Sequence, residues 1–186
     1  MPSTTAQSTW DARIARAREL ASIRPAARDL LLFYAALAEY QRTLAAGARD
    51  AGTFDIDIVI KAIPGFLDWL RSAGRADLAD SVDVDRVTLA LRQKSNDSHS
   101  LPAEAGSHPS EAALFVIESL VQAFAEHFGN VDAAASASFP MRCPRCSAPP
   151  VAAVLREEGH GAKRSLLCAL CLQEWECLRM VCPACG

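Results

Sequence analysis

No cysteine precedes Cys143 in this chain of 186 residues, and all seven cysteines lie in its last quarter. The hydrophobic content of 51% is enough for a buried core, so a larger domain without cysteine and a small cysteine-rich one are expected. The odd number of cysteines and their grouping in C-x-x-C pairs argue against a disulfide framework. The sequence therefore predicts two domains in a reducing compartment.

The chain also lacks a strong net charge, a basic-then-apolar segment at its start and a long apolar run. Its 19 basic and 22 acidic residues give a net charge of −3, which leaves no electrostatic footprint for DNA or RNA. The most apolar helical stretch, residues 112–128, contains Glu118, Gln122 and Glu126 and is short for a bilayer. We therefore expect a cytoplasmic protein with no membrane span, for which nucleic acid is a disfavoured partner.

Apolar residues at helical spacing dominate the sequence before the cysteines and predict an all-α bundle. A first helix capped by Thr9 is expected to end before Pro25, which fits the first turn of a second helix ending at Gly47. The second helix is the predicted centre of the bundle, because its apolar surface is wide enough for contacts on several sides. Its stripe comprises Leu30, Tyr34, Leu37, Gln41 and Leu44, widened by Leu31 and Phe33.

The middle of the helical domain is less regular. Residues 54–60 alternate apolar and acidic side chains as a strand does, but no partner strand is predicted nearby, so we expect helix or irregular structure. A short helix is predicted from Pro64 to Gly74, followed by two between residues 78 and 94 with a break at Asp83, which can cap the second.

A polar segment, residues 95–109, is predicted to be a loop because it is rich in Ser, Pro, Gly and Asn. Its His99 and His108 are expected to be exposed rather than to bind metal, since a polar loop offers no groups to orient them. The predicted organisation is a helical domain over residues 1–130, a linker over 131–142 and a cysteine module over 143–186.

The last predicted helix begins after Ser110, which can cap it, and ends at Gly129. It must be largely buried, because its apolar stripe is broad. The stripe comprises Leu114, Phe115, Ile117, Leu120, Val121, Phe124 and Phe128.

Four cysteines have the spacing of one four-sulfur metal site. Cys143 and Cys146 form the first C-x-x-C pair, and Cys168 and Cys171 form the second after 21 intervening residues. Two thiolates in such a pair can bind one ion from a tight turn whose backbone N–H groups point at the sulfurs. The separation suits a hairpin that brings both pairs to one end of a small sheet. Tetrahedral sulfur sites suit zinc and iron alike, so either ion is expected.

Short apolar segments adjoin these pairs and predict the strands of a rubredoxin-like or zinc-ribbon module. Residues 149–157 and 162–168 flank a glycine-bearing turn, and residues 173–181 form a third strand in which Trp175 can cover the metal. Cys177 is expected to be a buried structural thiol. The fold class is therefore α+β, and metal binding, worth about 10 to 16 kcal/mol in zinc-finger peptides, would hold the small module together.

The third pair, Cys182 and Cys185, is a possible incomplete second metal site, because two sulfurs do not close a tetrahedral site that needs four ligands. We expect it to be empty or weakly occupied. Four thiolates at the first site leave no position for a coordinated water, so a structural or electron-transfer role is favoured over hydrolysis. Thiol–disulfide chemistry is disfavoured, because it usually involves one such motif at the start of a helix, whereas these motifs adjoin strands.

Two regions of the chain resemble the formate dehydrogenase accessory protein family, FdhE. The first is residues 16–41, and the second comprises residues 143–155 and 163–185, with the Glu174–Trp175 pair and the third Cys pair as its most specific features. The resemblance implies a cytoplasmic accessory factor with a helical N-terminal domain and rubredoxin-like metal sites. It also implies that the protein binds the catalytic subunit of formate dehydrogenase, is needed for its activity and is not an enzyme.

The chain departs from the family pattern at two places. Ser147 stands where a glycine is usual, and family members continue beyond the third pair to a fourth, so the chain resembles a C-terminally truncated member. One alternative is therefore a truncated, nonfunctional remnant. Another is a zinc-ribbon nucleic-acid-binding protein. Its phosphate contacts would be Arg142, Arg145, Lys163, Arg164 and Arg179.

Overall fold

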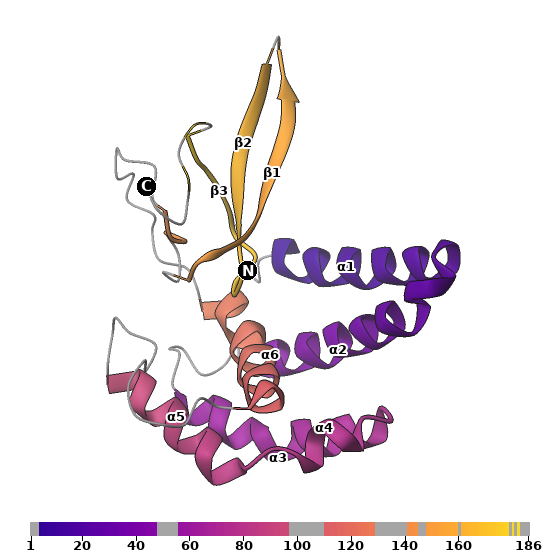
Figure 1. Ribbon diagram of the computed structural model, residues 1–186, viewed down its shortest axis with the longest axis vertical. Helices are drawn as coiled ribbons and strands as arrows, with labels where there is room; N and C mark the ends of the chain where they lie inside the picture. The colour runs from indigo at the N-terminus through magenta and orange to yellow at the C-terminus, as the bar shows by residue number, and fades with distance from the viewer. Residues whose placement is uncertain are drawn as a thin grey trace. The chain divides into compact units, whose positions relative to one another are not determined.

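The computed structural model describes residues 4–47, 56–96, 110–128, 141–144, 148–159, 161–178, 180 and 182 (Figure 1). The chain divides into two compact units, Met1–Phe124 and Ala125–Gly186. The first unit is helical and the second contains a small antiparallel sheet, which confirms the predicted α+β class. Within the described ranges, no helix is long and apolar enough to cross a membrane. The boundaries predicted at residues 130 and 142 stay predictions, because residues 129–140 lie outside the described part.

Two long helices joined by a short turn form the first part of the helical unit. Helix α1 is Thr4–Ile23, α2 is Arg28–Gly47, and Pro25–Ala27 between them form the 3-10 turn η1. The prediction that Thr9 caps the first helix is wrong, because α1 begins five residues earlier and no proline or glycine interrupts that stretch. Pro25 lies in η1 rather than in α2, and its missing N–H helps to explain why α1 stops at Ile23.

Helices α1 and α2 lie side by side on a contact made largely of alanine. Trp10, Ile14 and Ala17 of α1 form one buried cluster with Ala35 and Ala38 of α2. Alanine adds little bulk between two helices, so the backbones approach closely and the large ring of Trp10 is covered.

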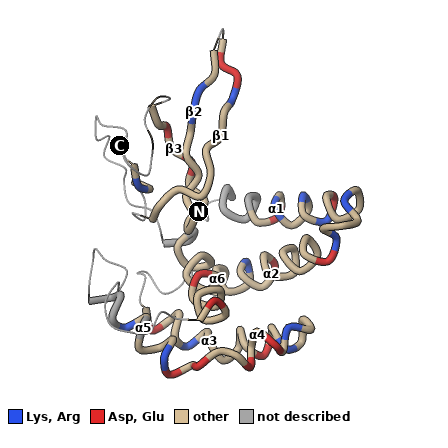
Figure 2. Tube along the Cα trace, viewed as in Figure 1, with Lys and Arg blue, Asp and Glu red and all other residues tan. Residues whose placement is uncertain are grey.

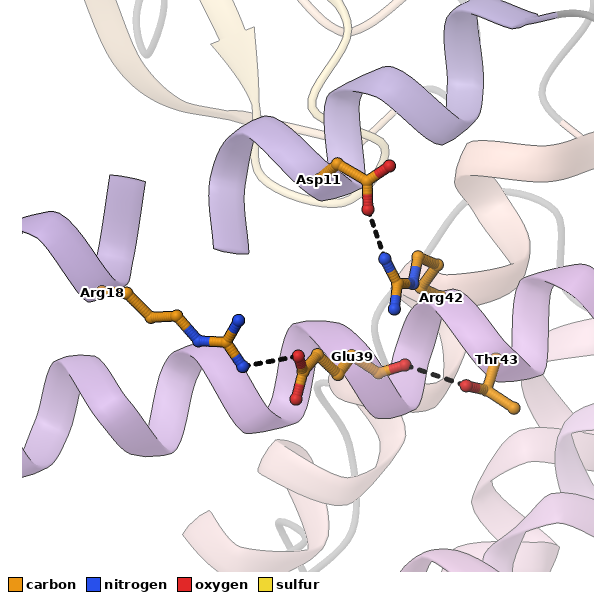
Figure 3. A network of polar contacts seen from close by, with 5 residues as sticks. All are labelled: Asp11, Arg18, Glu39, Arg42 and Thr43. Atoms are coloured by element: carbon orange, nitrogen blue, oxygen red, sulfur yellow. Dashed lines mark hydrogen bonds and ion pairs between the residues drawn. The ribbon is translucent and has the colours of Figure 1, made fainter. Parts of the chain in front are cut away.

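Ion pairs flank this apolar contact (Figure 3). Arg18 of α1 donates to Glu39 of α2 over 2.7 Å, and Arg42 of α2 pairs with Asp11 of α1. The Thr43 hydroxyl donates to the backbone carbonyl of Glu39 at 3.1 Å. These groups are partly exposed, so each pair stabilises the helix packing by no more than about 1 kcal/mol.

The predicted stripe of α2 is only partly buried. Leu37 and Gln41 are buried as expected, whereas Leu30 is 70% exposed and Tyr34 is 37% exposed. Helical spacing fixes the side of a helix on which a residue lies, but not how far along that side the neighbouring elements reach. The buried residues of α2 are Ala35, Leu37, Ala38, Gln41 and Ala45.

Helix α3, Ile56–Ser72, contains Pro64 in its interior. The prediction that a short helix starts at Pro64 is therefore wrong, and residues 56–60, which alternate like a strand, are helical. An interior proline costs about 3 kcal/mol. Each buried aliphatic or aromatic side chain stabilises the fold by roughly 1.5 to 3 kcal/mol. Because apolar residues at helical spacing continue on both sides of Pro64, their burial outweighs the cost of the proline. The buried residues are Val59, Ile63, Phe66, Leu67 and Leu70.

Glycine ends this helix as predicted. Gly74 has a φ of +77°, a conformation that side chains with a Cβ rarely adopt. The N–H of Arg75 donates to the carbonyl of Leu70 at 2.8 Å, and that of Gly74 donates to Arg71 at 3.1 Å. These two bonds form a Schellman motif, which satisfies carbonyls at the end of α3.

Two short helices follow, α4 over Ala76–Asp80 and α5 over Val84–Asn96. The predicted break and cap are confirmed, because the Asp83 carboxylate accepts the N–H of Arg86 at 3.1 Å. The predicted loop begins later than residue 95, since α5 runs to Asn96. Residues 97–109, including His99 and His108, lie outside the described part.

Helix α6, Glu111–Phe128, starts where the sequence predicts. The Ser110 hydroxyl accepts the N–H of Ala113 at 3.2 Å and caps the helix. The predicted stripe is wrong at Leu114, which is exposed, while Val116 and Ala123 outside the stripe are buried. Gly129 lies outside the described residues.

Aromatic rings from α2, α3 and α6 form the core of the helical unit. The ring centroid of Phe33 in α2 lies 5.8 Å from that of Trp69 in α3 and 6.3 Å from that of Phe115 in α6. Phe66 stacks on Trp69 at 5.5 Å, and Tyr40 contacts both rings of α3. Helix α2 therefore contacts α1, α3 and α6, which agrees with its prediction as the central helix.

One buried amide links α2 to α6 within this core. The Gln41 Nε2 donates to the backbone carbonyl of Ser119 at 2.7 Å and to the Gln122 side chain at 3.0 Å. Both amide hydrogens thus have acceptors, which removes most of the penalty of burying the group.

The second unit contains a three-stranded antiparallel sheet in the order β1-β2-β3. Strand β1 is Pro150–Glu158, β2 is Gly161–Cys168 and β3 is Glu174–Glu176. The predicted hairpin is confirmed, and Gly159, with a φ of +58°, lies in its turn. Pro150 pairs with Cys168 at the opposite end, so the cysteines lie at the base of the hairpin (Figure 1).

The third strand is shorter than predicted. It ends at Glu176 instead of continuing to residue 181. The N–H of Cys177 still donates to the Arg164 carbonyl at 3.1 Å, and the Arg164 guanidinium then donates to the carbonyl of Leu178 at 3.3 Å. Beyond Glu176, contacts of Arg164 with Cys177 and Leu178 therefore continue without regular strand pairing.

Candidate metal centre

Three cysteines that are distant in the sequence converge at the base of the hairpin. The sulfur atoms of Cys143, Cys168 and Cys171 all lie within 4.8 Å of one another, and those of Cys143 and Cys171 are 3.5 Å apart. All three residues are buried. Cys146 lies outside the described residues, so the four-sulfur set stays a prediction.

Main-chain hydrogen bonds hold the three cysteines in place. The N–H of Cys143 donates to the carbonyl of Ala148 at 3.0 Å, which closes the turn after the first cysteine. Cys168 is the last residue of β2, and its N–H donates to the Gln173 carbonyl at 3.0 Å. These bonds tie Cys143 to the residues just before β1 and Cys168 to the residues just before β3, which helps to hold the sulfurs near one another.

The turn after β2 has the N–H geometry expected of a metal-binding knuckle. The N–H groups of Leu170 and Cys171 both donate to the Cys168 sulfur at 3.3 Å. Donors to a sulfur stabilise the thiolate, the form that binds metal. The knuckle therefore favours a charged sulfur even though Cys168 is buried.

The spacing of the sulfurs fits a tetrahedral ion. Zinc–sulfur bonds of about 2.3 Å place tetrahedral ligand atoms about 3.8 Å apart. The 3.5 Å and 4.8 Å limits of the cysteine group bracket this value. The group of Cys143, Cys168 and Cys171 can thus hold a metal ion at three vertices, and sulfur ligands suit zinc and iron equally.

A small apolar core surrounds the sulfurs. Leu166 and Trp175, which are register partners on β2 and β3, are buried in one cluster with the three cysteines. Trp175 therefore packs beside the three cysteines, where the prediction that it covers a metal site requires it to be. Cys177 belongs to the same cluster, but it is not one of the converging cysteines among the described residues. This agrees with its prediction as a buried structural thiol.

Sequence reasoning missed Leu172, which follows the second knuckle with a φ of +55°. A side chain with a Cβ is strained in this left-handed conformation by roughly 1 to 2 kcal/mol. The sequence signal for this conformation is position: Leu172 directly follows the second C-x-x-C pair, as Ser147 directly follows the first, where the FdhE pattern usually has a glycine.

We expect Leu172→Gly to be more stable than Leu172→Ala by roughly 1 kcal/mol, which reverses the usual order of these residues. The comparison between the two variants removes the leucine side chain from both, so it isolates the backbone strain. Thermal unfolding of the metal-loaded protein measures the difference. An alanine variant equal to or more stable than the glycine variant would contradict the strain.

Ion pairs cover the face of the sheet opposite to the one that carries Leu166 and Trp175. Arg156 of β1 pairs with Glu174, and Lys163 of β2 pairs with Glu176. The hydrogen bond from Arg156 lowers the pKa of Glu174, and the hydrogen bond to Glu176 raises the pKa of Lys163. Charged groups therefore face solvent where the thiols face the core.

Several of the basic residues of the nucleic-acid alternative have partners within the chain. Lys163 pairs with Glu176, and the Arg164 guanidinium donates to the Leu178 carbonyl. Arg142 is exposed, while Arg145 and Arg179 lie outside the described residues. Lys163 and Arg164 thus interact with groups of the chain itself, so their positions give no specific support to the nucleic-acid alternative.

Of the two cysteines of the possible second site, the structure describes one. Cys182 is exposed, and Cys185 lies outside the described residues. The incomplete second site at Cys182 and Cys185 therefore stays a prediction.

A helical unit followed by a small sheet with converging cysteines at its base defines a helical protein with a zinc-ribbon-like module. Residues 142–179 match the family model described as FdhE, central domain. A segment of 44 residues is 46% identical to the Protein FdhE homolog of Stutzerimonas stutzeri (strain A1501), and it covers 23% of this chain and 14% of that relative.

The fold is similar to the crystal structure of the FdhE protein from Pseudomonas aeruginosa, with a TM-score of 0.57 and 21% identity. This similarity covers 100% of the present chain and 71% of that one. The resemblance to FdhE that the sequence predicts is thus found by the family model over residues 142–179 and in the curated relative, and the fold agrees with it.

Proposed function

We propose that this chain is an accessory factor for formate dehydrogenase, which binds the catalytic subunit of that enzyme in the cytoplasm and is not itself an enzyme. The observation that carries the proposal is the position of the family match. It covers residues 142–179, and this segment contains all three cysteines whose sulfurs converge. The segment that matches the family model therefore contains the three cysteines that could hold a metal ion.

The metal site of the proposal consists of Cys143, Cys146, Cys168 and Cys171 around one zinc or iron ion. The sulfurs of Cys143, Cys168 and Cys171 lie within 4.8 Å of one another, and the C-x-x-C spacing supports Cys146 as the fourth ligand. The ion would cross-link the base of the hairpin to the segment before β1. Four sulfurs leave no open position for water, so the site would act as a scaffold or in electron transfer.

The purified protein is expected to retain one tightly bound ion per monomer. Cys182 and Cys185 supply only two sulfurs, so a second ion there should be lost on dialysis against a weak chelator. Elemental analysis alongside a measured molecular mass checks the ratio. Two retained ions in a demonstrated monomer would show that further ligands exist.

Co-purification tests the proposed partner. A tagged catalytic subunit of formate dehydrogenase is passed over the immobilised chain, with the Pseudomonas aeruginosa FdhE protein as a reference. Retention of the subunit by this chain supports the proposal, and restored formate dehydrogenase activity in cells that lack their own accessory protein would extend it. Failure of this chain to retain the subunit, where the reference does so, would refute it.

A further inference from the structure

The corner at which α1 turns into α2 exposes apolar side chains next to two arginines. We name this surface the arginine–leucine corner and define it as Ile23, Arg24, Arg28, Leu30 and Tyr34. Ile23 is 59% exposed, and Leu30 and Tyr34 are exposed as given above. The five residues come from the end of α1, the turn η1 and the first turns of α2.

The apolar part of the corner extends a buried stripe. Leu30 and Tyr34 lie one helical turn apart, on the side of α2 that further along buries Leu37 and Gln41. Gln41 is covered by α6 through its bond to Ser119, whereas the stripe at Leu30 is open. Large apolar side chains at i and i+4 on an exposed helix are typical of a surface that binds another protein segment.

The two arginines of the corner have no ion-pair partner among the residues that the structure describes. Elsewhere on α1 and α2 arginines have partners: Arg16 pairs with Glu19, and Arg18 pairs with Glu39 (Figure 3). Arg24 and Arg28 are exposed, and within the described part of the chain neither guanidinium has an ion pair or a hydrogen bond. Asp29 is the one acidic residue among residues 23–34, so the corner has a net positive charge (Figure 2).

We infer that the arginine–leucine corner binds an acidic segment with aliphatic side chains on a partner protein. The aliphatic side chains would cover Leu30 and Tyr34, while carboxylates would accept hydrogen bonds from Arg24 and Arg28. The inference rests on the proposed function, because that function supplies the partner: the segment belongs to the catalytic subunit of formate dehydrogenase. The corner is thus the surface through which the helical unit contacts its client.

Charge reversal at the corner tests this inference. The double variant Arg24→Glu/Arg28→Glu is expected to retain the catalytic subunit at least tenfold more weakly than the unchanged protein. Leu30→Ser should also weaken retention, and Arg24→Lys/Arg28→Lys should keep it within about threefold. Raising the salt concentration should weaken binding of the unchanged protein more than that of the glutamate variant.

A matched control carries the same change in charge elsewhere on the helical unit. Lys61 of α3 and Arg86 of α5 are exposed, so Lys61→Glu/Arg86→Glu is expected to leave retention unchanged. Circular dichroism and thermal unfolding establish that each variant folds. Equal retention by the corner variant, the control and the unchanged protein would overturn the inference while leaving the proposed function in place.

A second readout separates failure of the corner from failure of the proposed function. Overlapping peptides that span the catalytic subunit are probed with the unchanged protein and with Arg24→Glu/Arg28→Glu. Capture of acidic, aliphatic peptides by the unchanged protein alone supports the corner, even if the whole subunit is not retained. Peptides captured equally by both proteins, or by neither, would overturn it.

Discussion

Replacement of Cys168 with serine is expected to release the metal and unfold the second unit while the helical unit stays folded. Cys168 is fully buried, ends β2 and accepts two N–H bonds at its sulfur, so serine there removes a metal ligand and weakens the knuckle at the same time. Metal binding contributes about 10 to 16 kcal/mol in zinc-finger peptides, which far exceeds what a small sheet can supply alone. Elemental analysis and limited proteolysis measure both effects.

Cys177→Ser is the matched control for this experiment. Cys177 lies buried in the same cluster, but its sulfur is directed to the carbonyl of Leu178 at 3.5 Å. The control is expected to lower stability by about 1 to 3 kcal/mol, as for a polar group placed in an apolar site, and to keep its ion. Equal loss of metal from both variants would mean that Cys177 is a ligand, and a Cys168→Ser protein that keeps its ion would refute the site.

Replacement of Phe66 with alanine is expected to lower the free energy of unfolding of the helical unit by about 3 to 5 kcal/mol. Phe66 is 1% exposed and packs between Tyr40, Trp69 and Phe115, so the change leaves a cavity where three helices meet. Chemical denaturation followed by helical circular dichroism measures the loss.

Leu89→Ala is the control for Phe66→Ala. Leu89 of α5 is mostly exposed, so its replacement should change the free energy of unfolding by less than about 0.5 kcal/mol. The metal content should be unchanged in both variants, since neither residue lies in the second unit. A Phe66→Ala protein as stable as the control would show that the aromatic cluster is not the core of the helical unit.

Features that depend on a few neighbouring residues could be predicted from the sequence. Asp83 and Ser110 cap helices as expected, because a cap needs only a side-chain acceptor three residues before an N–H donor. The hairpin between β1 and β2 also follows from local signals, namely two apolar segments around a glycine turn.

Features that depend on contacts between distant parts of the chain could not be predicted from the sequence. Pro64 was expected to begin a helix, yet α3 passes through it, because residues on both sides are buried by other helices. Leu30 was expected to be buried, yet the elements that cover Gln41 do not extend to it. Spacing shows the side on which a residue lies, whereas burial depends on what is packed there.

The metal centre shows the same division most clearly. The sequence by itself determined the kind of ligand and the two knuckles, because sulfur chemistry and C-x-x-C spacing are local properties. Only the tertiary structure decided that the sulfurs of Cys143, Cys168 and Cys171 meet within 4.8 Å and that Cys177, although buried in the same cluster, is not in this group. The reason is physical: the register of β1 on β2 brings Pro150 opposite Cys168, and strand register is set by pairing across the sheet rather than by either strand alone.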